Sequence, residues 1–242
     1  MSRKSKRNPP TETDPQPQTV SVRAASSRRY VFIAFAVALL LAFVGAALLY
    51  KSEQARASQL KAAKNLPALV SAHAPTFGSA EAKVHLVEFL DPACETCAAF
   101  FPHVKALLAD NPGRIRLSIR HVPFHQGSEE AVKLLEAART QGKYLQTMEA
   151  LYARQSQWTV RHVVQPDRVW QSVAGVGLDL DRLRNDMNTP EVARRMAQDM
   201  ADARSLGVTK TPEFFVNGRP LPAFGLDELR VLVSEELLRA YP

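Results

Sequence analysis

Apolar residues along the chain separate one membrane-like segment from a globular part. Residues 30–50 carry no charged side chain and have a tyrosine at each end. About 20 apolar residues are enough for a helix to cross a bilayer, and tyrosines are enriched at its two interfaces. The pattern therefore predicts one transmembrane anchor. A cleaved signal peptide is the alternative, since Ala55-Arg56-Ala57 resembles a cleavage box. Its apolar region is usually only about 7 to 15 residues long, however.

A second apolar run, Val84–Leu90, is almost uninterrupted, as in a strand that is buried on both faces. Asp91 and Pro92 end it. Apolar residues then recur at three- and four-residue steps, which predicts a helix beginning at or just before Cys94. These residues are Cys94, Cys97, Phe100, Phe101, Val104, Leu107 and Leu108. The chain's two cysteines thus lie at the junction of a strand and a helix.

The remaining pattern completes an α/β order. Residues 114–122 alternate as a strand does, so two strands with a helix between them are expected to form a βαβ unit. Helices are then predicted over residues 128–142, 144–152, 166–173, 180–187 and 190–206, followed by strands at 213–216 and 219–221 around an Asn-Gly turn and a last helix over 227–241. Near the anchor, we expect Pro67 to stop the membrane helix and Leu69-Val70 to form a short edge strand.

Two cysteines separated by two residues at a helix start are typical of redox chemistry. Unpaired N–H groups and the helix dipole favour an anion there, which would lower the pKa of Cys94 and leave Cys97 as the shielded, resolving thiol. A structural disulfide would close so short a loop that it stabilises by only about 2 kcal/mol. A zinc site would need two more ligands at suitable spacing. Coincidental spacing is the third alternative.

Charge adds little about partners. The net charge is +7, but residues 1–50 account for +5 of it, which leaves +2 for the rest. Nucleic acid is therefore not expected as a partner. Residues 1–29 are polar, basic and without apolar periodicity, so we expect a disordered tail. Residues 51–75 are expected to be a stalk or linker.

Four stretches carry a resemblance to the DsbA-like family of the thioredoxin superfamily. They are the C-x-x-C after Val87-Glu88-Phe89, then Pro123-Phe124-His125, Gln141-Gly142-Lys143-Tyr144, and residues 207–218. The resemblance implies a thioredoxin-like fold over residues 76–242, with a helical insertion at about 127–206. It also implies thiol-disulfide exchange with exported proteins, with no cofactor beyond the redox-active disulfide Cys94–Cys97 and no metal.

The resemblance assigns roles to further residues. Thr211-Pro212 matches the family's cis-proline loop, which binds extended substrates. Glu88 matches a buried acid that helps to move the proton of the second cysteine. The dipeptide between the cysteines, Glu95-Thr96, departs from the family, because strongly oxidising members usually have proline first. A carboxylate beside a thiolate should raise the pKa of Cys94 and make the disulfide less oxidising.

The sequence therefore predicts a membrane-anchored thiol-disulfide oxidoreductase. A chain with no other thiols suits an oxidising compartment, so we expect a cytoplasmic N-terminus and a periplasmic domain on a bacterial inner membrane. The expected partners are cysteine-containing exported proteins and a redox partner of unknown identity. Three alternatives stay open: a reductase or isomerase, a Cu(I)-handling protein using Cys94, Cys97 and a histidine (His103, His121 or His125), and an inactive structural domain.

Overall fold

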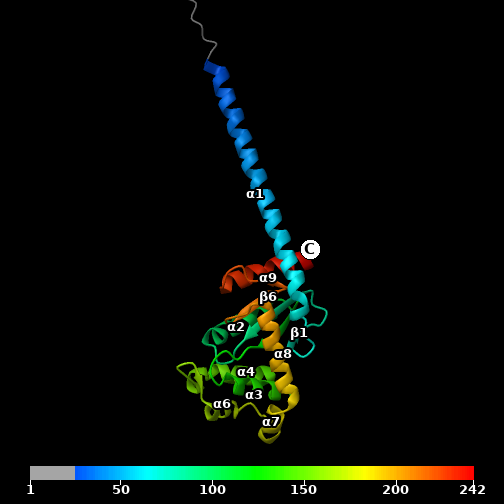
Figure 1. The fold of residues 1–242 in the computed structure, drawn as a ribbon, viewed down its shortest axis with the longest axis vertical. Helices are drawn as coiled ribbons and strands as arrows, with labels where there is room; N and C mark the ends of the chain where they lie inside the picture. Colours follow the sequence, from blue (N-terminus) through cyan, green and yellow to red (C-terminus); the bar gives the residue numbers. More distant parts are fainter. Residues whose placement is uncertain (1–24) are drawn as a thin grey trace, which may run out of the picture. The chain divides into compact units, whose positions relative to one another are not determined.

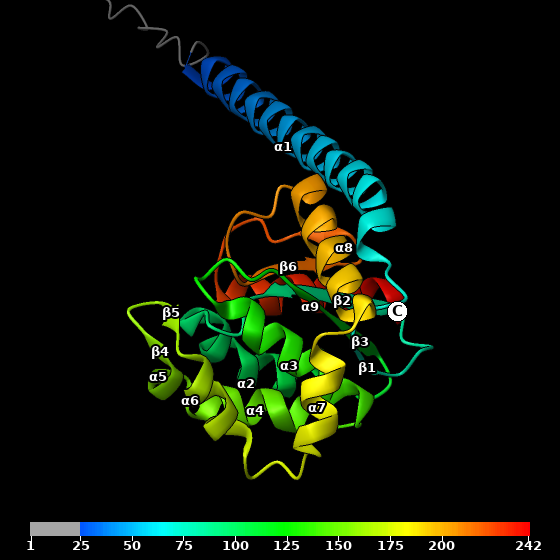
Figure 2. The ribbon, with the colours of Figure 1, turned by 60° about the horizontal axis from the view of Figure 1, so that its bottom comes forward.

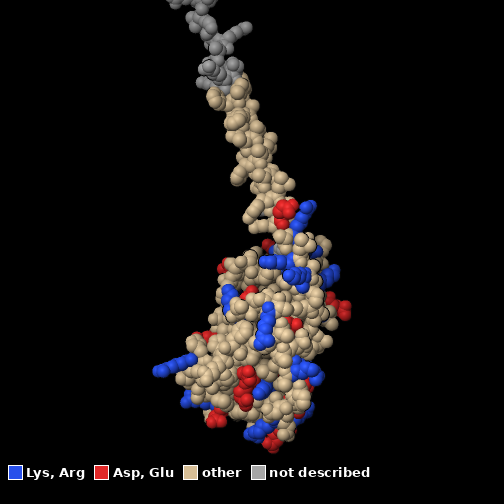
Figure 3. Space-filling model, viewed as in Figure 1, with Lys and Arg blue, Asp and Glu red and all other residues tan. Residues whose placement is uncertain are grey.

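The computed structural model describes residues 25–242, and the chain divides into two units, Met1–Gln54 and Ala55–Pro242. Helix α1 (Ala25–Leu69) passes through both. It contains an 18-residue window of mean hydropathy 2.8, none of it buried, so it is apolar and long enough to span a membrane. Figure 3 shows no Lys, Arg, Asp or Glu on the apolar part of this helix. Residues 25–29, expected in the tail, are helical, and the rest of that predicted tail lies outside the described residues.

The second unit is built on a mixed five-stranded sheet with the order β1-β3-β2-β6-β7 (Figure 1). The central strand β2 pairs in parallel with β3 and antiparallel with β6. The strands are β1 (Thr76–Gly78), β2 (Val84–Leu90), β3 (Ile115–His121), β6 (Glu213–Val216) and β7 (Arg219–Pro220). The βαβ unit and the terminal hairpin predicted from the sequence are both confirmed.

Eight helices and a small hairpin complete this unit. The helices are α2 (Glu95–Asp110), α3 (Ser128–Thr140), α4 (Tyr144–Ala153), α5 (Gln155–Trp158), α6 (Pro166–Val173), α7 (Leu180–Met187), α8 (Pro190–Leu206) and α9 (Leu226–Ala240), and the hairpin is β4 (Thr159–Val160) with β5 (Val163–Val164). The pattern predicted every helix here except the one-turn α5, and it did not predict the β4–β5 hairpin. Strands of two residues carry no period that a sequence can show.

The sheet is covered on both faces, which explains the apolar run in β2. Alternate β2 residues enter two separate cores: Leu86 and Leu90 pack with α2, α3 and α9, whereas Val87 and Phe89 pack with α8 and Leu69. Figure 2 shows α8 on one side of the sheet and α2, α3 and α4 on the other. Residues of α9 pack in the same core as those of α2 and α3. Glu88, which is two positions from both Leu86 and Leu90, therefore faces the larger core.

The predictions for the end of α1 are wrong. Pro67 lies inside the helix, which continues to Leu69, and Val70 still donates its N–H to the Leu66 carbonyl at 2.9 Å. A proline this close to the helix end removes only one backbone hydrogen bond, and burial of Leu69 favours continuation. The edge strand is instead β1, which pairs with β3.

The β6–β7 turn packs closely against the last turns of α1. Asn217 and Gly218 have φ angles of +48° and +83°, which confirms the predicted type I′ turn. A Cβ on Gly218 would lie 2.5 Å from the Ala62 carbonyl oxygen, and Asn65 donates to the Gly218 carbonyl at 3.1 Å. Part of the predicted stalk is therefore packed on the domain.

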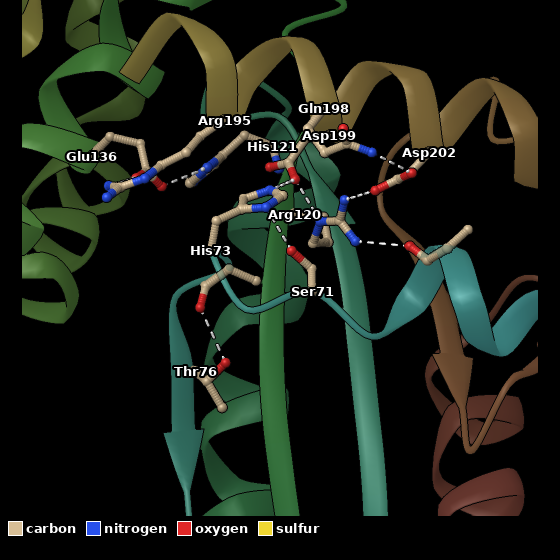
Figure 4. A network of polar contacts seen from close by, with 12 residues as sticks. Ser71, His73, Thr76, Arg120, His121, Glu136, Arg195, Gln198, Asp199 and Asp202 are labelled. Atoms are coloured by element: carbon tan, nitrogen blue, oxygen red, sulfur yellow. Dashed lines mark hydrogen bonds and ion pairs between the residues drawn. The ribbon is translucent and has the colours of Figure 1, made fainter. Parts of the chain in front are cut away.

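A buried polar network joins β3 to α8 and to the residues after α1 (Figure 4). The fully buried Arg120 donates to Asp199 at 2.5 Å, to Asp202 and to the Ala68 carbonyl. His73 contacts the same Asp199 oxygen at 2.7 Å. Burial alone would raise the pKa of Asp199, but the hydrogen bond with His73 and the charge of Arg120 lower it.

We expect Arg120→Ala to lower the free energy of unfolding by about 3 to 5 kcal/mol, because it leaves the Asp199 carboxylate buried without its cation. The exposed ion pair of Arg230 with Asp227 provides the control, and Arg230→Ala should cost less than about 1 kcal/mol. The measurement is denaturant unfolding of the full chain in detergent, followed by tryptophan fluorescence. Equal losses in the two variants would show that the network does not stabilise the fold.

Candidate active site

The C-x-x-C pair lies where β2 ends and α2 begins. Asp91 to Ala93 form the turn, and Cys94 is the N-cap residue of α2, with φ −75° and ψ 118°. Its position fits the predicted helix start. No side chain caps this helix end, so its first N–H groups face the cysteine sulfur. The two cysteines are unlinked in this structure.

Cys94 lies in surroundings that stabilise a thiolate. Hydrogen bonds from the Cys97 side chain, from the Thr211 side chain and from the N–H groups of Cys97 and Thr96 outweigh its burial and lower the pKa of Cys94 to about 5. In the thiol form, Cys94 donates its S–H to the Thr211 carbonyl oxygen at 3.4 Å. A thiol with this pKa is ionised at neutral pH and is therefore a ready nucleophile.

Cys97 lies one helical turn further along and has the opposite character. It is 0% exposed. Burial raises the pKa of its thiol well above the usual range, and the nearby charges of Glu88 and Cys94 add to this. The structure thus places an activated sulfur, Cys94, one helical turn away from a shielded, protonated sulfur, Cys97.

Glu88 is buried in the central strand, as expected from the apolar run around it. It is 2% exposed and lies in register with Ile119 of β3 and Phe214 of β6. By the strand alternation it faces the larger core, which also contains Cys97. Burial, with a smaller effect from the negative charge of Cys94, raises the pKa of Glu88 to about 8. Its carboxyl group is therefore mostly protonated at neutral pH.

The segment before β6 completes the site. The Thr211–Pro212 peptide bond is cis, which confirms the prediction for this loop. Thr211 is half-buried and Pro212 is buried. Strands β2 and β6 are antiparallel, with Phe89 opposite Glu213. The residues after Leu90 and the residues before Glu213 therefore emerge at the same edge of the sheet.

The dipeptide between the cysteines is exposed. Thr96 donates its backbone N–H to the Cys94 sulfur. The sequence predicted that the Glu95 carboxylate raises the pKa of Cys94, but several hydrogen bonds to the sulfur lower it. The structure shows a lowered pKa despite this carboxylate. Glu95 is not among the groups that determine this shift.

The three histidines considered as metal ligands have polar contacts of their own. His121 contacts the Tyr144 hydroxyl at 2.8 Å, His103 lies 3.4 Å from the Arg230 guanidinium, and His125 contacts Asp91 at 2.7 Å. Within residues 25–242, no group of three His, Cys, Asp or Glu side chains is arranged to hold a metal ion.

Sequence reasoning missed two groups that contact the turn before Cys94. The buried Asp91 accepts hydrogen bonds from Ala93 and His125, and the buried Gln155 donates to the carbonyls of Pro92 and Cys94. The Asp-Pro pair after a strand was a usable signal for Asp91. Gln155 has none, because it lies 61 residues from Cys94 along the chain.

The chain resembles known sequences over most of its second unit. A family model described as thioredoxin matches residues 71–235. Curated relatives include sodium/proton antiporters from Herminiimonas arsenicoxydans, 32% identical over 60% of this chain, and Salinispora tropica, 34% identical over 59%. The chain spans only 22% and 21% of the length of these two relatives.

Solved structures share the fold. A thioredoxin-like oxidoreductase from Silicibacter pomeroyi is 32% identical, with a TM-score of 0.61 over 70% of this chain and 95% of that one. BdbD from Bacillus subtilis is 23% identical (TM-score 0.60, 69% and 94% covered), and alpha-DsbA1 from Wolbachia pipientis is 20% identical (TM-score 0.63, 73% and 96% covered). The chain therefore belongs to the thioredoxin family and shares the fold of these DsbA-like proteins.

Proposed function

We propose that this protein is anchored in a membrane and exchanges disulfides with cysteines of exported proteins through Cys94 and Cys97. The observation that carries the proposal is the contrast between the two sulfurs. Hydrogen bonds lower the pKa of Cys94 to about 5, whereas burial raises the pKa of Cys97 well above its usual range. A nucleophilic thiolate beside a shielded thiol is the arrangement that disulfide exchange requires.

In the oxidising direction, a substrate thiolate attacks the Cys94 sulfur of the Cys94–Cys97 disulfide. The new bond is a mixed disulfide between substrate and Cys94, and the Cys97 sulfur leaves as a thiolate. The thiolate of a second substrate cysteine then attacks the sulfur of the first substrate cysteine in the mixed disulfide. A substrate disulfide forms, and Cys94 is released as a thiolate. Two electrons pass from the substrate to the protein, and a separate redox partner must remove them. No cofactor other than the cysteine pair takes part.

Glu88 is proposed to supply the proton that this exchange needs. The departing Cys97 thiolate is buried, so it must be protonated there. Glu88 faces the same core, and its carboxyl group is mostly protonated at neutral pH because its pKa is raised to about 8. The same group would take the proton back when Cys97 attacks in the reverse reaction.

Thr211 and Pro212 are proposed to bind the substrate chain. The half-buried Thr211 places its carbonyl oxygen 3.4 Å from the Cys94 sulfur, beside the atom that the substrate cysteine must reach. An extended peptide lying along this edge would pair its backbone with that of Thr211, as in strand addition.

The lowered pKa of Cys94 favours the oxidase direction over the reductase or isomerase alternative. A stabilised thiolate makes the reduced protein the more stable form and therefore makes its disulfide a stronger oxidant. We expect the Glu95 carboxylate to oppose this, as a like charge beside the thiolate. The relatives named as sodium/proton antiporters are much longer proteins, and this chain spans about a fifth of their length.

The reactivity of the two thiols tests the proposal. When the reduced full chain in detergent is treated with iodoacetamide, we expect Cys94 to be modified first, with half-maximal rate near pH 5, and Cys97 to stay unmodified. Mass spectrometry assigns the modified residue, and Cys94→Ser should abolish the fast reaction and disulfide exchange. Faster reaction at Cys97 would overturn the assignment. Stoichiometric Cu(I) that protects both thiols would favour the copper-handling alternative.

Glu95→Gln should lower the pKa of Cys94 by a few tenths of a unit, because it removes a like charge beside the thiolate. The disulfide should become more oxidising by on the order of 10 mV, since one pKa unit corresponds to about 30 mV for a two-electron couple. Thiolate absorbance and equilibration with glutathione measure the two quantities. An unchanged pKa would show that solvent screens the Glu95 carboxylate from the sulfur.

The proposed topology is a cytoplasmic tail and an extracytoplasmic domain, with the apolar part of α1 as the anchor. It is supported by the hydropathy of α1. It is also supported by the sequence, which has no cysteine other than Cys94 and Cys97 and so suits an oxidising compartment. A reporter that is active only outside the cytoplasm, fused after Pro242, should be active. If only a cytoplasmic reporter is active at this position, exported proteins cannot be the substrates.

A further inference from the structure

The turn that presents Cys94 is held by side chains from two distant parts of the domain. On one side, the fully buried Asp91 accepts the Ala93 N–H at 2.8 Å and the His125 N–H at 2.8 Å, and it contacts the His125 ring at 2.7 Å. These bonds join the turn to the loop after β3. They fix the start of the turn, but they leave the carbonyl groups of Pro92 and Cys94 to other partners.

Gln155 holds those carbonyl groups. It is the first residue of α5 in the helical insertion and is 7% exposed. Its side-chain nitrogen lies 2.8 Å from the Pro92 oxygen and 3.0 Å from the Cys94 oxygen. Both partners are acceptors, so the amide must present its NH₂ group, whose two hydrogens match the two oxygens.

These two contacts orient the peptide groups on either side of the reactive residue. The Pro92 carbonyl belongs to the peptide that leads into Ala93, and the Cys94 carbonyl belongs to the peptide that leads into Glu95. Fixing both planes fixes the backbone dihedral angles between them and thereby the direction of the Cys94 Cα–Cβ bond. The sulfur is then directed at the N–H groups of Thr96 and Cys97 and at Thr211.

We propose that Gln155 is a positioning residue for Cys94, through which the helical insertion controls the reactivity of the C-x-x-C pair. It touches no reacting atom and acts only through the two backbone carbonyls. The proposal rests on the proposed function, in which Cys94 is the attacking sulfur. It makes α5, outside the sheet and α2, part of the active-site machinery.

Gln155→Met tests the proposal, because methionine has a similar length and no donor. We expect the half-ionisation pH of Cys94 to rise by about one unit, which is a tenfold change in its ionisation constant and about 30 mV toward a more reducing couple. Thiolate absorbance and equilibration with glutathione are measured on the full chain in detergent. Gln157→Met is the matched control, since Gln157 is exposed on the same short helix, and it should leave both values unchanged.

Gln155→Asn is a second variant that keeps the test informative if Gln155→Met does not fold. It keeps the polar amide but withdraws it by one methylene group, so it should shift the Cys94 ionisation in the same direction. Lower thermal stability with an unchanged Cys94 titration would show a merely structural role and overturn the proposal. A wild-type Cys94 that titrates near pH 8 to 9 would instead overturn the proposed function. Wild type and both variants titrating alike near pH 5 would overturn only the role of Gln155.

Discussion

Because β2 is paired on both sides, its carboxyl end is a fixed point in the domain. The parallel register with β3 and the antiparallel register with β6 run along the strand, and its two faces enter separate cores. Residues that follow Leu90 and residues that precede Glu213 must then meet at one edge. Strand register therefore brings Cys94 and Thr211 close enough to contact each other.

At this edge, burial and hydrogen bonding act in opposite directions on the two sulfurs. Burial disfavours a thiolate at either position, yet at Cys94 the thiol of Cys97, the Thr211 side chain and the N–H groups of α2 outweigh it. Cys97 lies one turn deeper, where burial has the largest effect and the hydrogen bond with Cys94 adds to it. One helical turn is thus enough to convert two identical residues into a nucleophile and a protected thiol.

The sequence predicted the parts of this site that depend on local order. Apolar periodicity placed β2 and the start of α2, and with them the unequal positions of Cys94 and Cys97. The contacts of Gln155 and Arg120 could not be predicted, because they join residues 61 and 79 positions apart along the chain, beyond the range of any local pattern. Pro67 was assigned wrongly for a related reason: packing of Leu69 in the core outweighs the local preference of proline.

The same long-range contacts limit what the dipeptide between the cysteines can determine. Glu95 is exposed, whereas the groups that lower the pKa of Cys94 are Cys97 and Thr96 of α2 and Thr211 of the loop before β6. A change at Glu95 alters an exposed charge, whereas a change at Gln155 removes the two hydrogen bonds that hold the carbonyl groups of Pro92 and Cys94. The two residues between the cysteines therefore do not describe the surroundings of Cys94 on their own, because Cys97 of α2 and Thr211 of the cis-proline loop contact the same sulfur.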